Sequence, residues 1–246
     1  MQGSYFWHKL NIQRSKALIV GVFMIAAFNA EAQKKRWAEK NNPNYDERKL
    51  TYGFLIGLHT TSYQLKYVDA FADPNQFDTL HSVIPKWKPG FSLGFIVNYR
   101  LNDYLDLRVT PKVGFYEHEA VYRYTDNTPP ETRLVETTMV EMPLLLKYKS
   151  ERRGNIRMYM IGGVKPAIQA SGQKELENSE SLEVKGSNLH LEAGFGFDLY
   201  YPLFKFSPEI RFSRGIVDIL ENRTNPFGQP LKRVNTNTIT IYFLFQ

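Results

Sequence analysis

The side chains best suited to chemistry in this sequence are charged residues and histidines that alternate with apolar residues. They run from the middle of the chain toward its end, at Arg108, Lys112, His118, Glu141, Lys147, Lys165, His190, Glu192, Asp198, Glu209 and Arg211. A β-strand points successive side chains to opposite faces, so each of these segments would have one apolar and one charged face. Acids and bases are both present, and opposite charges on neighbouring strands can pair.

The favoured interpretation of these residues is a network of ion pairs inside a closed sheet. Its predicted members are Arg108, Lys112, His118, Glu141, Lys147, His190, Glu192, Glu209 and Arg211. Such a lumenal network would make the closed sheet rigid.

Catalysis is the alternative use of the same residues. A nucleophile must lie within hydrogen-bond reach of an oriented base, and Ser207 or Ser213 with His118 or His190 and Glu192 could supply these groups. Their spacing does not support this, and no strained Gly-x-Ser-x-Gly turn is expected. The same histidines with Glu192 match no metal-ligand motif. We therefore expect no enzyme activity, no metal, no cofactor and no small-molecule substrate.

Eight segments have the alternation of strands. They cover residues 50–67, 90–101, 104–124, 134–148, 156–171, 188–201, 204–216 and 237–246. The fifth is the least regular, because Gly162, Gly163 and Pro166 interrupt it. Several exceed the mean strand length of about five to six residues and match the nine to eleven or more residues that a tilted membrane-spanning strand needs.

The predicted connections alternate between long and short. The long ones are 68–89, 125–133, 172–187 and 217–235, and the short ones are 102–103, 149–155 and 202–203. Long extracellular loops and short periplasmic turns are typical of outer-membrane barrels. The expected fold is all-β, an eight-stranded antiparallel up-and-down transmembrane β-barrel of the outer-membrane type.

The final ten residues of the sequence show the pattern of a closing strand. Ile239, Ile241, Phe243 and Phe245 share one face, which would contact lipid. In a soluble protein such a strand would be an aggregation-prone edge. Pairing it with the first strand would remove both edges of the sheet.

The N-terminal residues predict export and removal of a signal peptide. Lys9, Arg14 and Lys16 precede the apolar run 17–28, and a small-x-small site follows at 30–32. This is the order of a secretory signal, and the run is shorter than the roughly twenty residues of a spanning helix. We predict a signal peptide at 1–32 cleaved after Ala32, a periplasmic N-terminal segment at 33–49 and an outer-membrane barrel at 50–246.

The amino-acid composition excludes several kinds of anchor, cross-link and partner. The sequence has no cysteine, which excludes disulfides and a lipoprotein anchor. The formal net charge is +6, from 31 basic and 25 acidic residues. No dense basic cluster with interleaved aromatics occurs, so nucleic acid is not an expected partner.

Four segments resemble blocks of a known family. NNPNYDERKLTYGFLIGLHT (41–60) and FKFSPEIRFSRGIVDIL, the end of the block 194–220, are the more specific, whereas LNDYLDLRVTPKVGF (101–115) and VEMPLLLKY (140–148) are shared by many small Bacteroidota barrels. The chain resembles the PorT family, also called SprT. That resemblance implies an outer-membrane component of type IX protein secretion and, in gliding bacteria, of motility, with no known catalytic residues.

A narrow barrel restricts how such a protein would act. Eight strands enclose an interior just wide enough for side chains, so folded cargo cannot pass through it. The expected role is an accessory scaffold or assembly factor, with outer-membrane lipid and other type IX secretion subunits as partners. The expected contact surfaces are the periplasmic segment 33–49 and the long loops. Two alternatives remain: a structural or adhesin-type barrel acting through its outer loops, and a lumenal enzyme or small-ligand binder at His190 and Glu192.

Overall fold

The computed structural model describes residues 40–72, 80–125, 129–172, 184–223 and 227–246. The predicted signal peptide, residues 33–39 of the predicted periplasmic segment and most of the loop 172–187 lie outside these residues. The chain divides into two compact units, and the larger one contains every strand. The description below concerns that unit, which comprises Asn42–Arg152 and Ile156–Gln246.

The described part of the chain contains eleven β-strands and two short 3-10 helices. The helices are η1 (Pro43–Glu47) and η2 (Asp69–Ala72). The strands are β1 (Leu50–Tyr67), β2 (Leu80–Lys86), β3 (Lys88–Arg100), β4 (Leu105–Val109), β5 (Lys112–Tyr124), β6 (Glu131–Glu141), β7 (Leu144–Lys149), β8 (Ile156–Gly172), β9 (Ser187–Tyr200), β10 (Lys205–Gly215) and β11 (Leu231–Phe245). No helix in these residues is long and apolar enough to cross a membrane.

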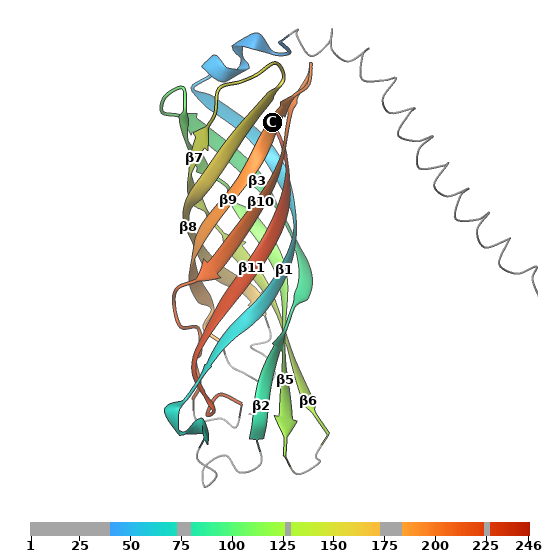
Figure 1. Cartoon of the computed structure of the whole chain (residues 1–246), viewed down its shortest axis with the longest axis vertical. Helices are drawn as coiled ribbons and strands as arrows, with labels where there is room; N and C mark the ends of the chain where they lie inside the picture. Colours follow the sequence, from blue (N-terminus) through green and yellow to red (C-terminus); the bar gives the residue numbers. More distant parts are fainter. Residues whose placement is uncertain (1–39, 73–79, 126–128, 173–183, 224–226) are drawn as a thin grey trace, which may run out of the picture. The chain divides into compact units, whose positions relative to one another are not determined.

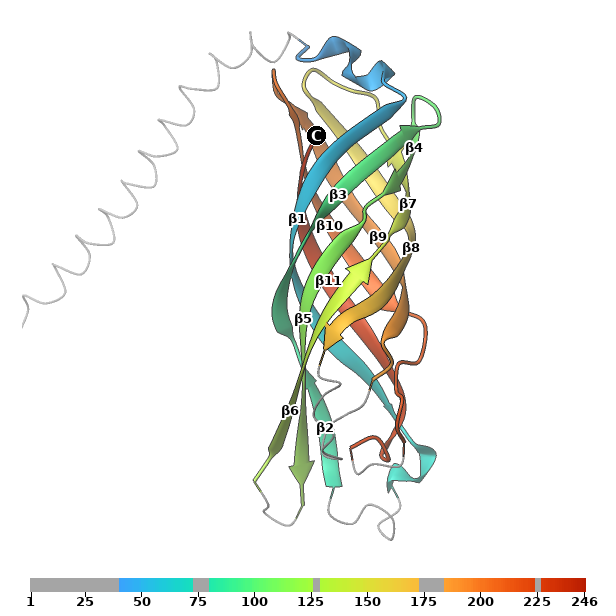
Figure 2. The ribbon, with the colours of Figure 1, turned by 180° about the vertical axis from the view of Figure 1, so that it is seen from behind.

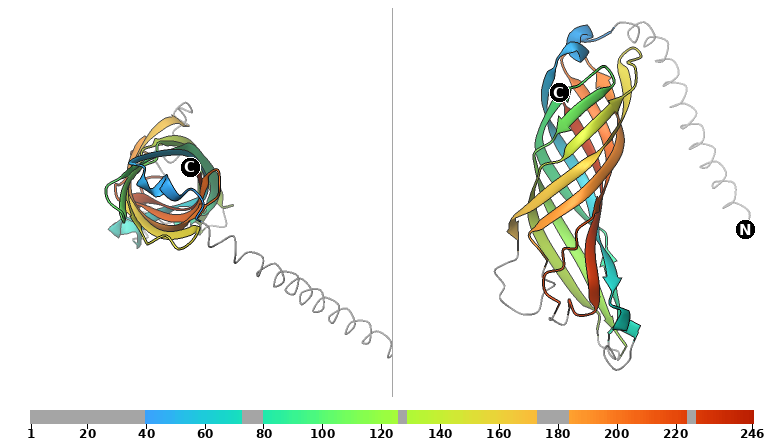
Figure 3. Two further views of the ribbon diagram at one scale, coloured as in Figure 1. Left: turned by 90° about the horizontal axis from the view of Figure 1, so that it is seen from above. Right: turned by 90° about the vertical axis from the view of Figure 1, so that its left-hand side faces the viewer.

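Hydrogen bonding joins the strands into one antiparallel sheet whose pairings lead back to their starting point. β1 pairs with β3, β3 with β5, β5 with β6, β6 with β8 and β8 with β9. β9 then pairs with β10, β10 with β11, and β11 with β1. The strands therefore surround a central space, which the end-on view shows (Figure 3), and they tilt together around it (Figures 1 and 2). The predicted all-β, antiparallel class is confirmed.

The predicted count of eight strands differs from the eleven observed because prolines divide two of the predicted elements and because a further strand, β2, lies in a predicted loop. Pro111 separates β4 from β5, and Pro143 separates β6 from β7. A proline has no N–H to donate to a neighbouring strand, but its carbonyl still accepts. Phe95 donates to the carbonyl of Pro111 over 2.9 Å, and Thr110 donates to that of Pro143 over 3.2 Å. The ladder thus continues past each break.

Three predicted boundaries are wrong. The expected loop 68–89 contains β2, which extends β3 beyond Trp87 and pairs with β5. The expected loop 217–235 contains the first residues of β11, which begins at Leu231. The expected interruption at Gly162 and Gly163 is absent, because β8 runs unbroken from Ile156 to Gly172.

The two faces of the sheet differ in chemistry. The outer face has a band of exposed apolar and aromatic residues, with Phe95 69% and Met160 67% exposed. Tyr52, Tyr99, Tyr104, Tyr148 and Tyr201 end this band near the short turns. Aromatic girdles of this kind flank the lipid-facing band of outer-membrane barrels. We therefore assign the short turns, η1 and the end of β11 to the periplasmic side, and the long connections to the extracellular side.

Candidate functional site

The centre of the barrel is filled by ion pairs around Glu209 of β10. Its carboxylate accepts a hydrogen bond from Arg108 of β4 over 2.8 Å and one from the Tyr159 hydroxyl over 2.6 Å. Arg211, two residues further along β10, also donates to it. Neither arginine has any exposed side-chain area. One carboxylate therefore holds two buried guanidinium groups.

The network continues toward the extracellular side through two more glutamates. Glu192 of β9 lies 3.3 Å from the Arg211 guanidinium and accepts the Ser213 hydroxyl over 2.6 Å. The Lys165 ammonium lies 3.8 Å from Glu192 and 2.8 Å from Glu141, so it links the two carboxylates. Lys112 lies 3.0 Å from Glu141. These contacts join β5, β6, β8, β9 and β10 across the lumen.

Toward the periplasmic side the network ends on Asp198 of β9. Lys147 of β7 lies 2.6 Å from this carboxylate, and the Ser207 hydroxyl donates to it over 2.6 Å. A second ammonium, that of Lys205, lies 4.0 Å away. Beyond it, a separate pair joins Lys149 to Asp106 over 2.6 Å.

Tyrosine rings accommodate the excess of cations over carboxylates. The Lys147 ammonium lies 3.7 Å from the centre of the Tyr159 ring, and the Arg211 guanidinium lies 4.4 Å from that of Tyr242. An aromatic face attracts a cation most strongly where water is excluded. The tyrosines occupy the same inward positions as the charges, so they are structural partners of the network.

The structure places all nine residues of the predicted lumenal network inside the barrel, at 8% exposure or less. Seven of them take part in its ion pairs, and His118 and His190 do not. Sequence reasoning omitted Lys205 and the tyrosine partners. The alternation of β8 and β11 places Tyr159 and Tyr242 inward and could have indicated these tyrosines. Alternation gives less information about Lys205, because it is the first residue of its strand.

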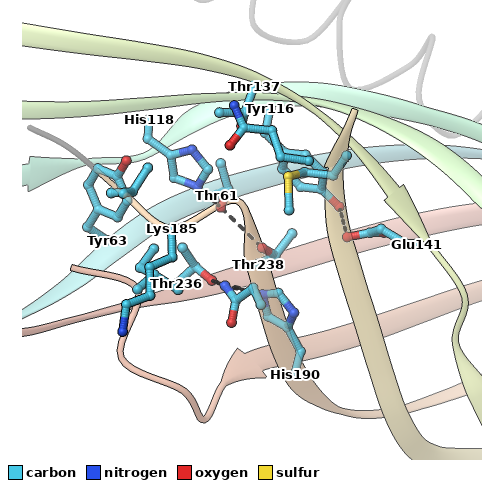
Figure 4. Close-up of a pocket in the computed structure, with 15 residues that line it drawn as sticks. Thr61, Tyr63, Tyr116, His118, Thr137, Glu141, Lys185, His190, Thr236 and Thr238 are labelled. Carbon is cyan, nitrogen blue, oxygen red and sulfur yellow. Dashed lines mark hydrogen bonds between the residues drawn. The ribbon is translucent and has the colours of Figure 1, made fainter. Parts of the chain in front are cut away.

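His118 and His190 line a cavity on the extracellular side of the network (Figure 4). The cavity has a volume of about 40 Å³, room for about three waters. His118 contacts Thr61 over 3.2 Å and stacks on Tyr63, and His190 contacts Thr236 over 2.8 Å. Each histidine is therefore bonded to a threonine hydroxyl and not to a serine or a glutamate.

The geometry does not bring together the serine, histidine and glutamate considered for catalysis. The hydroxyls of Ser207 and Ser213 donate to carboxylates, and neither contacts a histidine. The pattern Gly-x-Ser-x-Gly does occur, at residues 90–94, but its Ser92 lies within the extended strand β3 and not at a turn. No group of three histidine or acidic residues in the described ranges is arranged to hold a metal.

The periplasmic mouth is covered by η1, seen across the opening in Figure 3. Asp46 accepts hydrogen bonds from Arg157 over 3.1 Å and from the Tyr200 hydroxyl over 2.7 Å. The Tyr45 ring meets Tyr200 edge to face, and burial raises the pKa of Tyr45 to about 12. Residues 42–48 are thus fixed to the barrel and form a lid on this mouth.

Replacing Asp46 by Ala should release this lid. The substitution leaves Arg157 and Tyr200 without their shared acceptor, and we expect a loss of about 1–2 kcal/mol of local stability. Trypsin should then cleave after Arg48 and Lys49 faster than in the wild type, while the strands stay protected. Glu47→Ala is the control, because Glu47 is exposed. Equal cleavage rates for the two variants would contradict the assignment of the lid.

The extracellular end is narrowed by the connection after β10. Leu220 forms an isolated bridge with Val184 and packs in a buried apolar cluster with Tyr63, Ile219, Leu231 and Val234. Burial tends to raise the pKa of Asp218. Hydrogen bonds from the N–H groups of Val234 and Leu220 outweigh this effect, so the pKa lies below its usual value. The connection is therefore held inward by apolar packing and by the backbone hydrogen bonds that the Asp218 carboxylate accepts.

Comparison with known proteins agrees with the architecture. A family model described as an outer membrane protein beta-barrel domain matches residues 31–221. No curated protein matches the chain. Similar solved structures include the outer membrane protein OprG from Pseudomonas aeruginosa, at 12% identity over 80% of this chain and 95% of that chain, with a TM-score of 0.46.

Two further structures are similar at the same level. Neisserial surface protein A is 10% identical over 80% of this chain and 98% of that chain, with a TM-score of 0.41. The attachment invasion locus protein Ail of Yersinia pestis is 11% identical over 79% of this chain and 96% of that chain, with a TM-score of 0.32.

Proposed function

The chain belongs to the outer membrane protein beta-barrel domain family, and from this premise we propose that it is a non-enzymatic accessory scaffold or assembly factor of the type IX protein secretion and gliding machinery. It is an outer-membrane protein. The finer role is supported by the resemblance of residues 41–60 and 204–220 to the PorT family. The proposal places its contacts with other secretion subunits on the periplasmic lid and on the outer loops.

The observation that carries the proposal is the filled lumen. Arg108, Arg211 and Lys147 have no exposed side-chain area, and their pairing with Glu209, Glu192 and Asp198 occupies the centre of the barrel. Charges in such a network are costly to separate, because each would be left buried without its oppositely charged partner. A folded protein therefore has no path through this chain. A role in secretion must be exerted at its ends or on its outer wall.

A deletion strain tests this role. We expect proteins that carry the type IX C-terminal signal to be lost from the medium and retained in the cell, and a plasmid copy of the gene to restore their release. A periplasmic protein without that signal is the control for general export. Normal release of the signal-bearing proteins in the deletion strain would contradict the proposal.

A second strain tests whether the segment before the lid is the surface that contacts other secretion subunits. It carries the chain without residues 34–40, which keeps residues 42–48 of the lid and the hydrogen bond from the Asn41 N–H to Asn155. If the segment before the lid binds a secretion subunit, release should fall although the barrel is still inserted in the outer membrane. Normal release would assign the function to the lid or to the outer loops.

A further inference from the structure

Three cations gather on one side of the outer wall, just beyond the apolar band. Arg214 of β10, Arg233 of β11 and Lys66 of β1 are exposed and lie on three neighbouring strands, which face the viewer in Figure 1. We propose that they form a binding site for the phosphate groups of an outer-leaflet lipid.

The position of Arg214 sets the depth of the site. It follows Phe212, an exposed residue of the apolar band, by two positions on β10 and so points the same way. Its partners in the sheet are Asn237 of β11 and Leu191 of β9, and Leu191 is 51% exposed. An arginine at this level keeps its stem against the apolar band and its guanidinium at the headgroups.

Arg233 brings a second guanidinium to the same place. Its Nη2 donates to the carbonyl of Ile216 over 2.5 Å. Ile216 follows Arg214 by two residues, a separation of about 7 Å along an extended chain. The Arg233 side chain therefore crosses from β11 to the end of β10. Two arginines on neighbouring strands at the same end of the apolar band suit a phosphate group, which arginine binds through paired N–H donors.

Lys66 adds an unfavourable contact that an anion would relieve. It pairs directly with Arg233 in the register of β1 and β11. Like charges directly opposite each other on a sheet are destabilising. No carboxylate in the described ranges forms an ion pair with Lys66, Arg214 or Arg233. The nearby Asp69 is paired with Lys232 over 2.7 Å, which is the main cause of its lowered pKa, and Lys66 is a minor further cause. The cluster therefore keeps an excess of positive charge.

The far side of the wall carries acidic residues beside its exposed cations Lys86 and Arg123, so it has no comparable excess of positive charge. Glu117 of β5 pairs in register with Glu136 of β6, and the neighbouring Glu119 forms an ion pair with Lys88. A lipid phosphate is therefore attracted more strongly to the side that carries Lys66, Arg214 and Arg233. The proposed ligand is a phosphorylated lipid held at the outer interface, with its acyl chains along Phe212 and Ile239.

Binding of bisphosphoryl lipid A to the full chain in neutral detergent, followed by native mass spectrometry, tests the site. Arg214→Gln/Arg233→Gln should bind about 30-fold more weakly than the wild type, from the typical contribution of two interfacial cations. Lys86→Gln/Arg123→Gln removes two exposed cations from β2 and β5 and should bind like the wild type. Migration of unboiled protein in a gel shows that both variants are folded.

Two further ligands identify the chemistry. Dephosphorylated lipid A with the same acyl chains should bind weakly, and inorganic pyrophosphate should compete poorly, because it lacks contact with the apolar band. Equal binding of phosphorylated and dephosphorylated lipid would overturn the proposal, as would wild-type affinity in the double variant. Pyrophosphate bound as tightly as the lipid would show a site for free phosphate and would also overturn it.

Discussion

Glu209→Ala is expected to lower the free energy of unfolding by about 3–5 kcal/mol, the usual cost of removing one partner from a buried ion pair. The Glu209 side chain is fully buried and accepts from Arg108, Arg211 and Tyr159. Without it, two guanidinium groups in the centre of the lumen lose their shared carboxylate. Urea unfolding in detergent, followed by the gel migration of the folded barrel, measures the change.

Glu136→Ala is the matched control for this measurement. Glu136 is an exposed glutamate on β6 that lies directly opposite Glu117. Its removal takes away a repulsion between like charges, so we expect stability to be unchanged or slightly increased. A loss of less than about 1 kcal/mol in Glu209→Ala would show that water or rearranged neighbours compensate the arginines.

Gly163→Ala should damage the barrel as severely, for a steric reason. A Cβ atom at this position would lie 2.1 Å from the carbonyl oxygen of Leu144 and 2.9 Å from the Cα of Leu145, both on the backbone of β7. Backbone of a paired strand cannot move aside as a flexible side chain can. We expect a loss of about 3 kcal/mol or more, at the upper end of the range for overpacking. The same unfolding assay measures it.

The adjacent glycine provides the control. A Cβ atom on Gly162 would have the Glu192 carbonyl oxygen at 3.6 Å as its nearest neighbour, an ordinary contact. Gly162→Ala should therefore fold with wild-type stability. Equal effects of the two substitutions would mean that β7 and β8 are not as close as the structure places them.

These two glycines also show what the sequence alone could not provide. Alternation gave the bounds of β1 and the outward face of β3, because their residues follow a period of two with few exceptions, such as the inward apolar residues Leu55 and Ile96. The same reasoning read Gly162 and Gly163 as an interruption, although close approach of β7 requires Gly163. It read Lys232, Arg233 and Asn235 as loop because they are polar, whereas they begin β11 outside the apolar band.

The pairing of the charged residues inside the lumen could not be predicted from the sequence. Inward direction follows from alternation, but the pairing of Arg108 with Glu209 depends on register between β4 and β10, strands that are not adjacent in the sheet. The sequence therefore indicated which residues enter the interior and not which of them meet. His118 and His190 illustrate this, because they face inward yet line a separate cavity among threonines.

The pairing of β1 with β11 has a consequence for how the barrel forms. Thr61 and Thr238 are direct partners in this ladder, and they are 177 residues apart along the chain. Contacts between such distant residues form slowly, because the entropy of closing a long loop is lost before any contact compensates it. Until they form, β1 and β11 each present an unpaired apolar edge to the periplasm. The chain should therefore depend on periplasmic chaperones and insertion machinery for longer than a protein whose edges close locally.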